Sequence, residues 1–323
     1  MMKAAMIGTW HVHTEGYAEE FCQDPRCQLT AVWDSDKEKA SCFAEKFGCK
    51  AYADLDRLYQ EADFEAVIIC SATNEHVPLM VRAAEAGKHI FTEKVLATTA
   101  EGAEQIRNAV RENNVKFVIS YPHKTNPGVM FAKQMIQEGT LGTITYARVR
   151  NAHSGSLDGW LPEHFYDKAQ CGGGAMMDLG AHPMYTLLWL LGEPERVSSA
   201  FTTVTGKPVE DNAVSILSYA NGAIGVSETG FVSNYGNYVL EVIGTKGAVR
   251  IVDDQTMMAN QSSGGKWMPV SLPQPAKLPI AQWIDDVVEG IPAKEYGIEE
   301  AVQLSRLMES AYRASEEKCS AAY

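Results

Sequence analysis

The stretch that decides the fold is Met2-Lys3-Ala4-Ala5-Met6-Ile7-Gly8-Thr9-Trp10-His11-Val12-His13, residues 2–13. Its first six residues form a compact, largely apolar run that ends at Gly8. An amphipathic segment follows, with Tyr17, Ala18 and Phe21 on one side. This order predicts a buried strand, a turn and a helix.

The same alternation of strand and helix continues to about residue 120. Apolar runs that predict strands lie at 29–33, 66–70, 89–91 and 115–120, and segments with helical spacing lie at 37–47, 55–59, 75–86 and 99–112. Apolar strands separated by amphipathic helices predict a parallel sheet covered on both faces. In such sheets, ligands bind beyond the carboxyl ends of the strands.

The turn after the first strand stands where a dinucleotide-binding fold carries Gly-x-Gly-x-x-Gly. Only the first glycine matches, because Trp10 and His13 occupy the other two glycine positions. The N-terminus of the following helix can still face a diphosphate. We therefore predict cofactor contacts from the whole turn, which comprises Gly8, Thr9, Trp10, His11, Val12 and His13.

Asp34 ends the second predicted strand. A carboxylate at this place would accept hydrogen bonds from the adenosine ribose and repel a phosphate, which favours NAD over NADP. The alternative is a simple helix cap, for which Ser35 and Asp36 compete. We favour the ribose role.

The pair His11 and His13 also suggests a metal ion. No third ligand at a recognisable spacing accompanies them in the sequence, so we predict no metal site.

The chemistry is predicted to lie in residues 171–183, Cys-Gly-Gly-Gly-Ala-Met-Met-Asp-Leu-Gly-Ala-His-Pro. If a helix begins directly after the glycines, Asp178 and His182 share one helical face and can reach one ligand together. The glycines remove side chains, so another backbone or a flat ligand ring can approach closely. The alternative is a glycine loop before a core helix, with a capped Asp and a satisfied His.

Further small and polar residues follow later strands, in Ser71-Ala72-Thr73-Asn74-Glu75-His76 and Thr92-Glu93-Lys94-Val95. The order of these motifs, with Gly8 and Asp34 before them and the glycine stretch after them, resembles the glucose-fructose oxidoreductase and inositol dehydrogenase (Gfo/Idh/MocA) family. The resemblance spans nearly the whole chain. The family usually has proline, often after a cis bond, where this chain has Val95.

The resemblance implies an N-terminal Rossmann domain for NAD(P) and catalytic roles for Lys94, Asp178 and His182. It also implies a C-terminal α/β domain whose open sheet holds the substrate and often mediates oligomerisation. From these implications we predict further cofactor contacts at Ser71, Ala72, Thr73, Asn74, His76, Glu93 and Lys94.

The period changes in the second half of the chain. A helix at 129–138 and a strand at 144–150 come first, and strand-like runs follow at 197–205, 213–219, 224–229, 238–243 and 248–252. The end is helical, at 281–289 and 299–316. We predict an α/β fold, with a Rossmann domain at residues 1–120 and an α/β domain with a large, mostly antiparallel open sheet at residues 121–323. The exposed sheet face predicts a homodimer or homotetramer.

Candidate substrate residues lie at two places. Tyr121, His123 and Lys124 follow the sixth strand, where the family often carries an Asn or Arg near the nicotinamide, although linker residues at the surface are nearly as good an interpretation. Trp160 and His164 precede the glycines, and aromatic faces beside polar groups suit a carbohydrate or polyol. Ordinary helix packing explains Trp160 equally well.

Composition limits the class of protein. A formal net charge of -13 in 323 residues opposes sequence-independent binding to nucleic acid or anionic membranes. No apolar run is long enough to cross a bilayer, and Met1 to Gly8 is too short for a signal peptide. The seven cysteines are scattered without a Cys-x-x-Cys, which fits reduced thiols and a cytoplasmic location.

We predict an NAD-dependent dehydrogenase that oxidises a secondary hydroxyl of a sugar, polyol or glycoside. His182 would accept the hydroxyl proton, Asp178 would fix the substrate or orient the imidazole, and Lys94 would hold the reacting oxygen. One alternative is a glycoside-cleaving or epimerising enzyme that recycles NAD in each turnover. Another is a non-catalytic NAD-sensing protein.

Overall fold

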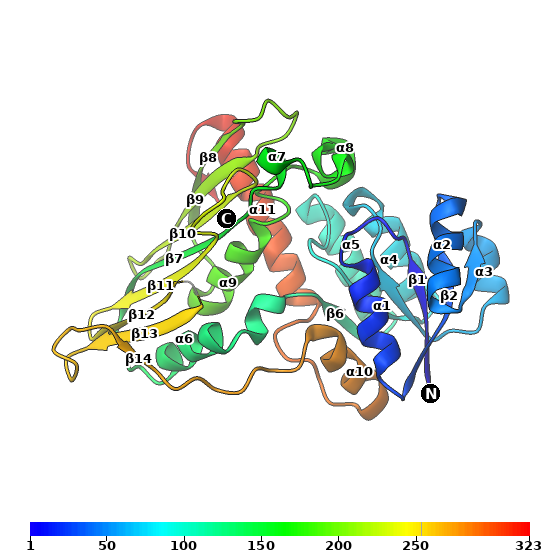
Figure 1. Cartoon of the computed structure of the whole chain (residues 1–323), viewed down its shortest axis with the longest axis horizontal. Coiled ribbons are helices and arrows are strands. Elements are labelled where there is room, and N and C mark those ends of the chain that lie inside the picture. The colour runs from blue at the N-terminus through cyan, green and yellow to red at the C-terminus, as the bar shows by residue number, and fades with distance from the viewer. Residues whose placement is uncertain (253) are drawn as a thin grey trace. The chain divides into compact units, whose positions relative to one another are not determined.

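The computed structural model describes residues 1–252 and 254–323, shown in Figure 1. They form two compact units, the first made of residues 1–120 and 277–302, the second of residues 121–276 and 303–323. The sequence predicted a first domain that ends at residue 120, and the first segment of unit 1 ends there. The prediction differs from the structure in residues 277–302, which it assigned to the second domain.

Segment 277–302 belongs to the first unit because its helix α10 (Pro279–Glu289) is strongly amphipathic and buries its aromatic side chain there. The Trp283 ring is fully buried, with its centroid 6.1 Å from that of Phe21 and 5.7 Å from that of Phe91. The backbone N–H of Ile119 also donates to the carbonyl of Tyr296 at 2.9 Å. These contacts join residues far apart in sequence, which periodicity alone does not reveal.

The first unit contains a six-stranded, all-parallel sheet in the order β3-β2-β1-β4-β5-β6. This is the strand order of doubly wound dinucleotide-binding folds, so the predicted parallel sheet is confirmed. The strands are β1 (Met2–Ile7), β2 (Cys27–Trp33), β3 (Lys50–Tyr52), β4 (Ala66–Ile69), β5 (His89–Thr92) and β6 (Phe117–Ile119). The helices are α1 (Thr14–Gln23), α2 (Lys37–Phe47), α3 (Leu55–Glu61), η1 (Thr73–Glu75), α4 (His76–Glu85) and α5 (Ala100–Glu112).

The order of the strands brings distant loops together. Strand β1 lies between β2 and β4, so the loop after β1 meets the residues that follow both neighbours at the carboxyl edge of the sheet. The backbone N–H groups of Trp10 and His11 each donate to the carbonyl of Cys70 at 3.1 Å. Ligands bind at this edge in sheets of this kind.

The second unit contains a nine-stranded sheet in the order β14-β13-β12-β11-β7-β10-β9-β8-β15. Among the strands that residues 121–252 and 254–323 form, only β7 and β10 pair in parallel, which confirms the predicted mostly antiparallel sheet. Its strands are β7 (Ile144–Ala152), β8 (Arg196–Thr202), β9 (Asn212–Ser218), β10 (Ile224–Gly230), β11 (Tyr238–Gly244), β12 (Gly247–Val252), β13 (Gln255–Asn260), β14 (Met268–Pro269) and β15 (Ala321–Ala322).

Helices cover one face of this sheet, as Figure 1 shows for α6 (Pro127–Gln137) and α9 (Ala181–Leu191). The sheet residues that alternate toward them are buried, and the intervening residues of β9 are exposed. The remaining elements are η2 (Pro122–Thr125), α7 (Gly155–Asp158), η3 (Glu163–Tyr166), α8 (Lys168–Cys171) and α11 (Ile298–Glu317). Among the described residues, no helix combines the length and the apolar content needed to cross a membrane.

Candidate functional site

Position 8 requires glycine because two loops of the first unit approach each other closely there. Its φ of +79° lies in the left-handed region, and a Cβ at this position would lie 2.6 Å from the Cα of Ser71. A side chain here would therefore both strain the backbone and push apart the loops after β1 and β4. The structure thus explains why this one glycine of the dinucleotide motif is kept.

Asp34 is buried at the carboxyl end of β2 and tied to the loop after β1. Its Oδ2 accepts hydrogen bonds from the backbone N–H and the hydroxyl of Thr9, each at 2.7 Å. The helix cap that was the alternative role belongs instead to Asp36, whose carboxylate accepts from the first N–H groups of α2. Asp34 therefore stands where the ribose role requires, and that role stays a prediction.

The N-terminus of α1 offers a test of whether this edge fits a dinucleotide. His13 occupies the N-cap of α1 without a side-chain cap hydrogen bond, and the N-cap of α4, Glu75, has none either. Helices α2, α3 and α5 are capped by the side chains of Asp36, Asp54 and Thr99, whereas α10 has no side-chain cap either. An uncapped helix N-terminus at the carboxyl edge of β1 suits a diphosphate, so the residues present fit the cofactor.

His76 lies deeper than a direct cofactor contact requires. Its imidazole is almost fully buried; Nδ1 lies 3.0 Å from the carbonyl oxygen of Val95, and Nε2 lies 3.3 Å from that of Ser71. Burial lowers the pKa of this imidazole. The side chain thus braces the loop that carries Lys94, whose peptide bond to Val95 is cis. The other predicted contacts, at residues 71–74, lie after β4, and their role in cofactor binding stays a prediction.

Glu93 lies beside the two histidines of the first loop. Its Oε2 is 3.3 Å from Nδ1 of His13 and 3.9 Å from Nδ1 of His11, and it also accepts a short hydrogen bond from the Tyr17 hydroxyl. Burial acts to raise the pKa of this carboxyl group, but the neighbouring imidazoles and the Lys94 ammonium hold it well below its usual value. The group is therefore a buried carboxylate anion.

The glycine stretch of the second unit is packed against protein. A Cβ at Gly173 would lie 1.8 Å from the Tyr312 hydroxyl, and one at Gly174 would lie 2.1 Å from the carbonyl oxygen of Glu210. Of the two possibilities that the sequence left open for these glycines, the structure therefore shows the approach of protein groups.

The helix after the glycines begins later than predicted. Helix α9 starts at Ala181, and Asp178 lies in the turn before it, so Asp178 and His182 do not share a helical face. The reason is the Glu210 carboxylate, whose Oε1 accepts from the N–H groups of Gly174 and Met176 at 2.9 and 3.0 Å. These bonds hold residues 174–176 outside a regular helix.

His182 is buried at the start of α9 among aromatic rings. Its Nδ1 lies 2.9 Å from the Tyr185 hydroxyl, which also accepts the backbone N–H of His123 at 3.0 Å. The His182 ring stacks on that of His123 with a centroid distance of 4.5 Å. Tyr121 stacks on Tyr185 at 4.2 Å, so four predicted or neighbouring residues form one cluster.

The other predicted substrate residues differ in their surroundings. Lys124 is buried, with its ammonium 5.1 Å from the Tyr121 ring centroid and 5.6 Å from that of Trp189. Trp160 is 56% exposed and its ring contacts His153, while the carbonyl oxygen of His164 accepts from the Cys171 thiol. Substrate binding by Lys124, Trp160 and His164 stays a prediction.

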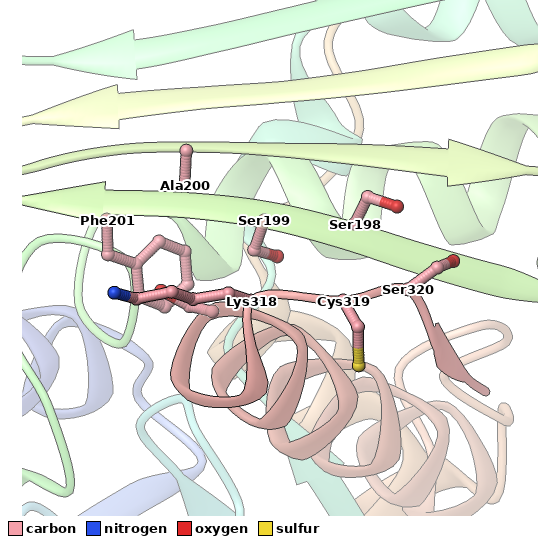
Figure 2. A pocket seen from close by; sticks show the side chains of 8 residues that line it. Ser198, Ser199, Ala200, Phe201, Lys318, Cys319 and Ser320 are labelled. Carbon is pink, nitrogen blue, oxygen red and sulfur yellow. The ribbon is translucent and has the colours of Figure 1, made fainter.

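A hollow of about 530 Å³ lies elsewhere in the second unit, between β8 and the end of α11. Figure 2 shows Ser199 and Phe201 pointing from the strand toward the segment Lys318–Ser320. None of the predicted site residues lines it, so this hollow gives no support to the predicted substrate site.

Sequence reasoning missed two residues that organise the site. The contact of Tyr185 with His182 could have been predicted from the sequence, because Tyr185 lies one helical turn after His182 and a hydroxyl there can reach the imidazole. The contact of Glu210 could not, because it reaches the glycine stretch only through the folding of the second unit.

Comparisons with known proteins agree with this architecture. Residues 2–121 match the family model described as "Oxidoreductase family, NAD-binding Rossmann fold", and residues 129–250 match the "GFO/IDH/MocA C-terminal domain". The two models belong to one family and together cover most of the chain.

Named relatives act on sugars and polyols. The chain is 29% identical over 250 residues to a levoglucosan dehydrogenase of Pseudarthrobacter phenanthrenivorans, a match that covers 68% of this chain but only 63% of that relative. It is 28% identical over 271 residues to an inositol 2-dehydrogenase of Rhizobium meliloti, covering 82% of this chain and 78% of the relative. The chain therefore spans less than two thirds of the length of the first of these.

A solved structure shows the same fold. Levoglucosan dehydrogenase in complex with NADH and L-sorbose superposes with a TM-score of 0.88 at 20% identity, over 100% of this chain and 98% of the other. At that identity the likeness concerns the fold alone.

Proposed function

The chain belongs to the GFO/IDH/MocA oxidoreductase family, and on this basis we propose that it oxidises a secondary hydroxyl of a sugar, polyol or glycoside with NAD. The two named relatives, which are dehydrogenases of levoglucosan and of inositol, support the substrate class. The observation that carries the proposal is the placement of His182, whose imidazole is held by Tyr185 and His123 at the N-terminus of α9.

When bound, NAD supplies the acceptor for the hydride that leaves the alcohol carbon. The chain must take up the hydroxyl proton as the carbonyl forms. In the tautomer whose Nδ1–H donates to the Tyr185 oxygen, Nε2 of His182 is the proton-accepting nitrogen. The stacked rings fix the plane of that imidazole. The proton acceptor is therefore already oriented before the reaction begins.

Asp178 and Lys94 complete the proposed set. Asp178 lies in the turn that leads into α9, half-buried and close in sequence to His182, and would hold a substrate hydroxyl. Lys94 follows the buried Glu93 at the carboxyl end of β5, where an ammonium would favour negative charge on the reacting oxygen.

Incubation with NAD and a panel of monosaccharides, anhydrosugars and inositols tests the function. Appearance of absorbance at 340 nm during turnover supports the dehydrogenase. Substrate conversion without that absorbance would favour the alternative in which NAD is reduced and reoxidised within each turnover. No conversion of any compound, together with tight NAD binding, would favour the NAD-sensing protein.

Asp34→Ala should narrow the preference for NAD over NADP. The variant loses the carboxylate that would bind the ribose hydroxyls and repel the extra phosphate. Isothermal titration calorimetry with both nucleotides measures the gap directly. Tighter binding of NADP than of NAD by the unchanged protein would contradict the proposed preference.

Asp36→Ala is a matched control for this measurement. Asp36 lies two residues further on and caps α2 through the N–H groups of Glu38 and Lys39. Its loss should cost about 1 kcal/mol of stability and leave the ratio of the two nucleotide affinities unchanged.

We further propose that the open face of the second unit's sheet joins copies of this chain. Apolar side chains on that face are between 38% and 45% exposed at Val214, Ile216, Ile224 and Ile243. Ile224 and Ile243 flank Tyr146 in one row across β10, β7 and β11. An apolar row of this kind on an uncovered sheet face favours a subunit interface.

Ile224→Glu combined with Ile243→Glu should shift the protein toward a monomer, because charges opposed across a two-fold interface repel. Sedimentation velocity measures the change. Val288→Glu, which alters an exposed apolar residue of α10, is the control and should leave the assembly intact. A monomeric unchanged protein at micromolar concentration would rule out the proposed interface.

A further inference from the structure

Three metal-binding side chains meet in the first unit, at His11, His13 and Glu93. One ligand atom of each lies within 4.8 Å of the other two. The two histidines come from the loop after β1 and the glutamate from the end of β5, so the fold, and not a local motif, assembles the group. The sequence had offered only the two histidines.

We propose that His11, His13 and Glu93 form a binding site for a divalent transition-metal ion of the zinc class, with a fourth coordination position open to water or a ligand oxygen. Two imidazoles and one carboxylate are a donor set that open zinc sites use. This inference goes beyond the proposed function, which assigns no role to a metal.

The distances between the donors suit one ion. Ligand atoms about 2.0–2.1 Å from a tetrahedral Zn²⁺ lie about 3.3 Å from one another. The separation of Nδ1 of His13 from Oε2 of Glu93 is 3.3 Å, and that of Nδ1 of His11 from the same oxygen is 3.9 Å. All three ligand atoms lie within 4.8 Å of one another, and the His11 nitrogen would have to move closer to the Glu93 oxygen when an ion binds.

The surroundings also favour a cation. The Glu93 side chain is 3% exposed, and a buried carboxylate needs positive partners; the Lys94 ammonium already lies near it, and a metal ion would add to that charge. The Tyr17 hydroxyl donates to Glu93 and lies 2.8 Å from the Ser120 hydroxyl, so the carboxylate is oriented as outer-shell groups orient metal ligands.

The first loop is held in place as well. The backbone N–H of His11 donates to the carbonyl of Cys70 at 3.1 Å. The backbone N–H of His13 donates to Nδ1 of His11 at 3.2 Å, so this nitrogen carries no hydrogen and its lone pair faces that N–H. A metal ion would take the place of that hydrogen bond.

The competing interpretation is a network of hydrogen bonds and ion pairs among the same side chains without a metal. Both interpretations explain why the residues lie together. They differ in whether Zn²⁺ or Co²⁺ binds to the whole protein with one ion per chain at this place, in the absence of nucleotide.

The test uses the full-length protein after treatment with a chelator. Zn²⁺ affinity is measured by competition with a chromogenic chelator, and Co²⁺ is titrated to observe the visible absorption bands of a tetrahedral complex. We expect one Zn²⁺ per chain, and His13→Ala should weaken the affinity at least about 100-fold. His13 is 49% exposed, so its loss leaves the core intact.

Two further variants make the outcome specific. Glu93→Gln should lower Zn²⁺ affinity and change the Co²⁺ spectrum, because an amide is a poorer ligand than a carboxylate. His89→Ala removes a histidine at the opposite end of the same strand β5 and should change neither. Equal Zn²⁺ binding by the unchanged protein and by His13→Ala, or no stoichiometric binding by either, would overturn the proposal. Since no nucleotide is present, this result is independent of the proposed dehydrogenase activity.

Discussion

His182→Ala should lower the single-turnover rate of NAD reduction by about 10²- to 10⁴-fold, the usual contribution of a positioned general base. The affinity for NAD should change little, because the predicted nucleotide contacts lie in the first unit. Stopped-flow absorbance at 340 nm, with enzyme in excess over a substrate found in the panel above, measures the rate. Titration calorimetry measures the affinity.

The expected size of this effect follows from how the imidazole is held. Tyr185 and the stacked His123 ring fix its orientation, so its removal loses both the proton acceptor and its alignment. Tyr185→Phe should therefore lower kcat while leaving KM nearly unchanged, since it keeps the ring stack on Tyr121 but removes the oxygen that contacts Nδ1.

His153→Ala is the matched control, because His153 also stacks on an aromatic ring of the second unit, that of Phe231 at 5.0 Å. This variant should turn over at a rate close to that of the unchanged protein. If His182→Ala reduces NAD normally and Lys94→Ala does not, the proton acceptor is Lys94 and our assignment to His182 is wrong.

Most helices and strands could be predicted from the sequence, because hydrophobic spacing and capping residues are local signals. The helix at 37–47 was predicted with the bounds that the structure gives α2, since Asp36 caps it and Gly48 ends it in the left-handed region. Strand β3 escaped prediction because three residues carry too little pattern. The sequence did not predict that residues 277–302 belong to the first unit, because the burial of Trp283 depends on a long-range contact.

The candidate site was readable only in part, for the same reason. Sequence reasoning named His11, His13 and Glu93 as cofactor contacts and found no third metal ligand beside the two histidines. The parallel order of β1, β4 and β5 brings the three side chains together. That two loops follow strands of one sheet was a usable signal, since such loops share an edge. The later start of α9 could not be predicted from the sequence, because it depends on the side chain of Glu210, which is 36 residues away from Gly174.

Glu210→Ala should destabilise the second unit by about 3–5 kcal/mol. Oε1 of Glu210 accepts three hydrogen bonds, from the N–H groups of Gly174 and Met176 and from the Tyr312 hydroxyl at 2.6 Å. Each donor left without an acceptor away from water costs about 1–3 kcal/mol. Burial and the neighbouring carboxylate raise the pKa of the Tyr312 hydroxyl, which therefore stays protonated and keeps its need for an acceptor.

Differential scanning calorimetry of Glu210→Ala measures the loss, and Glu210→Gln is the control. The amide of Gln keeps one oxygen that can accept the same bonds, so the control should retain most of the stability. Residues 174–176 lead directly into the turn with Asp178 and the first residues of α9. Glu210→Ala should therefore also lower the rate at which the enzyme reduces NAD, at temperatures where the second unit is still folded. A variant with unchanged stability and rate would show that the glycine stretch holds its conformation without Glu210, through the packing of Gly173 against Tyr312 and of Gly174 against the backbone.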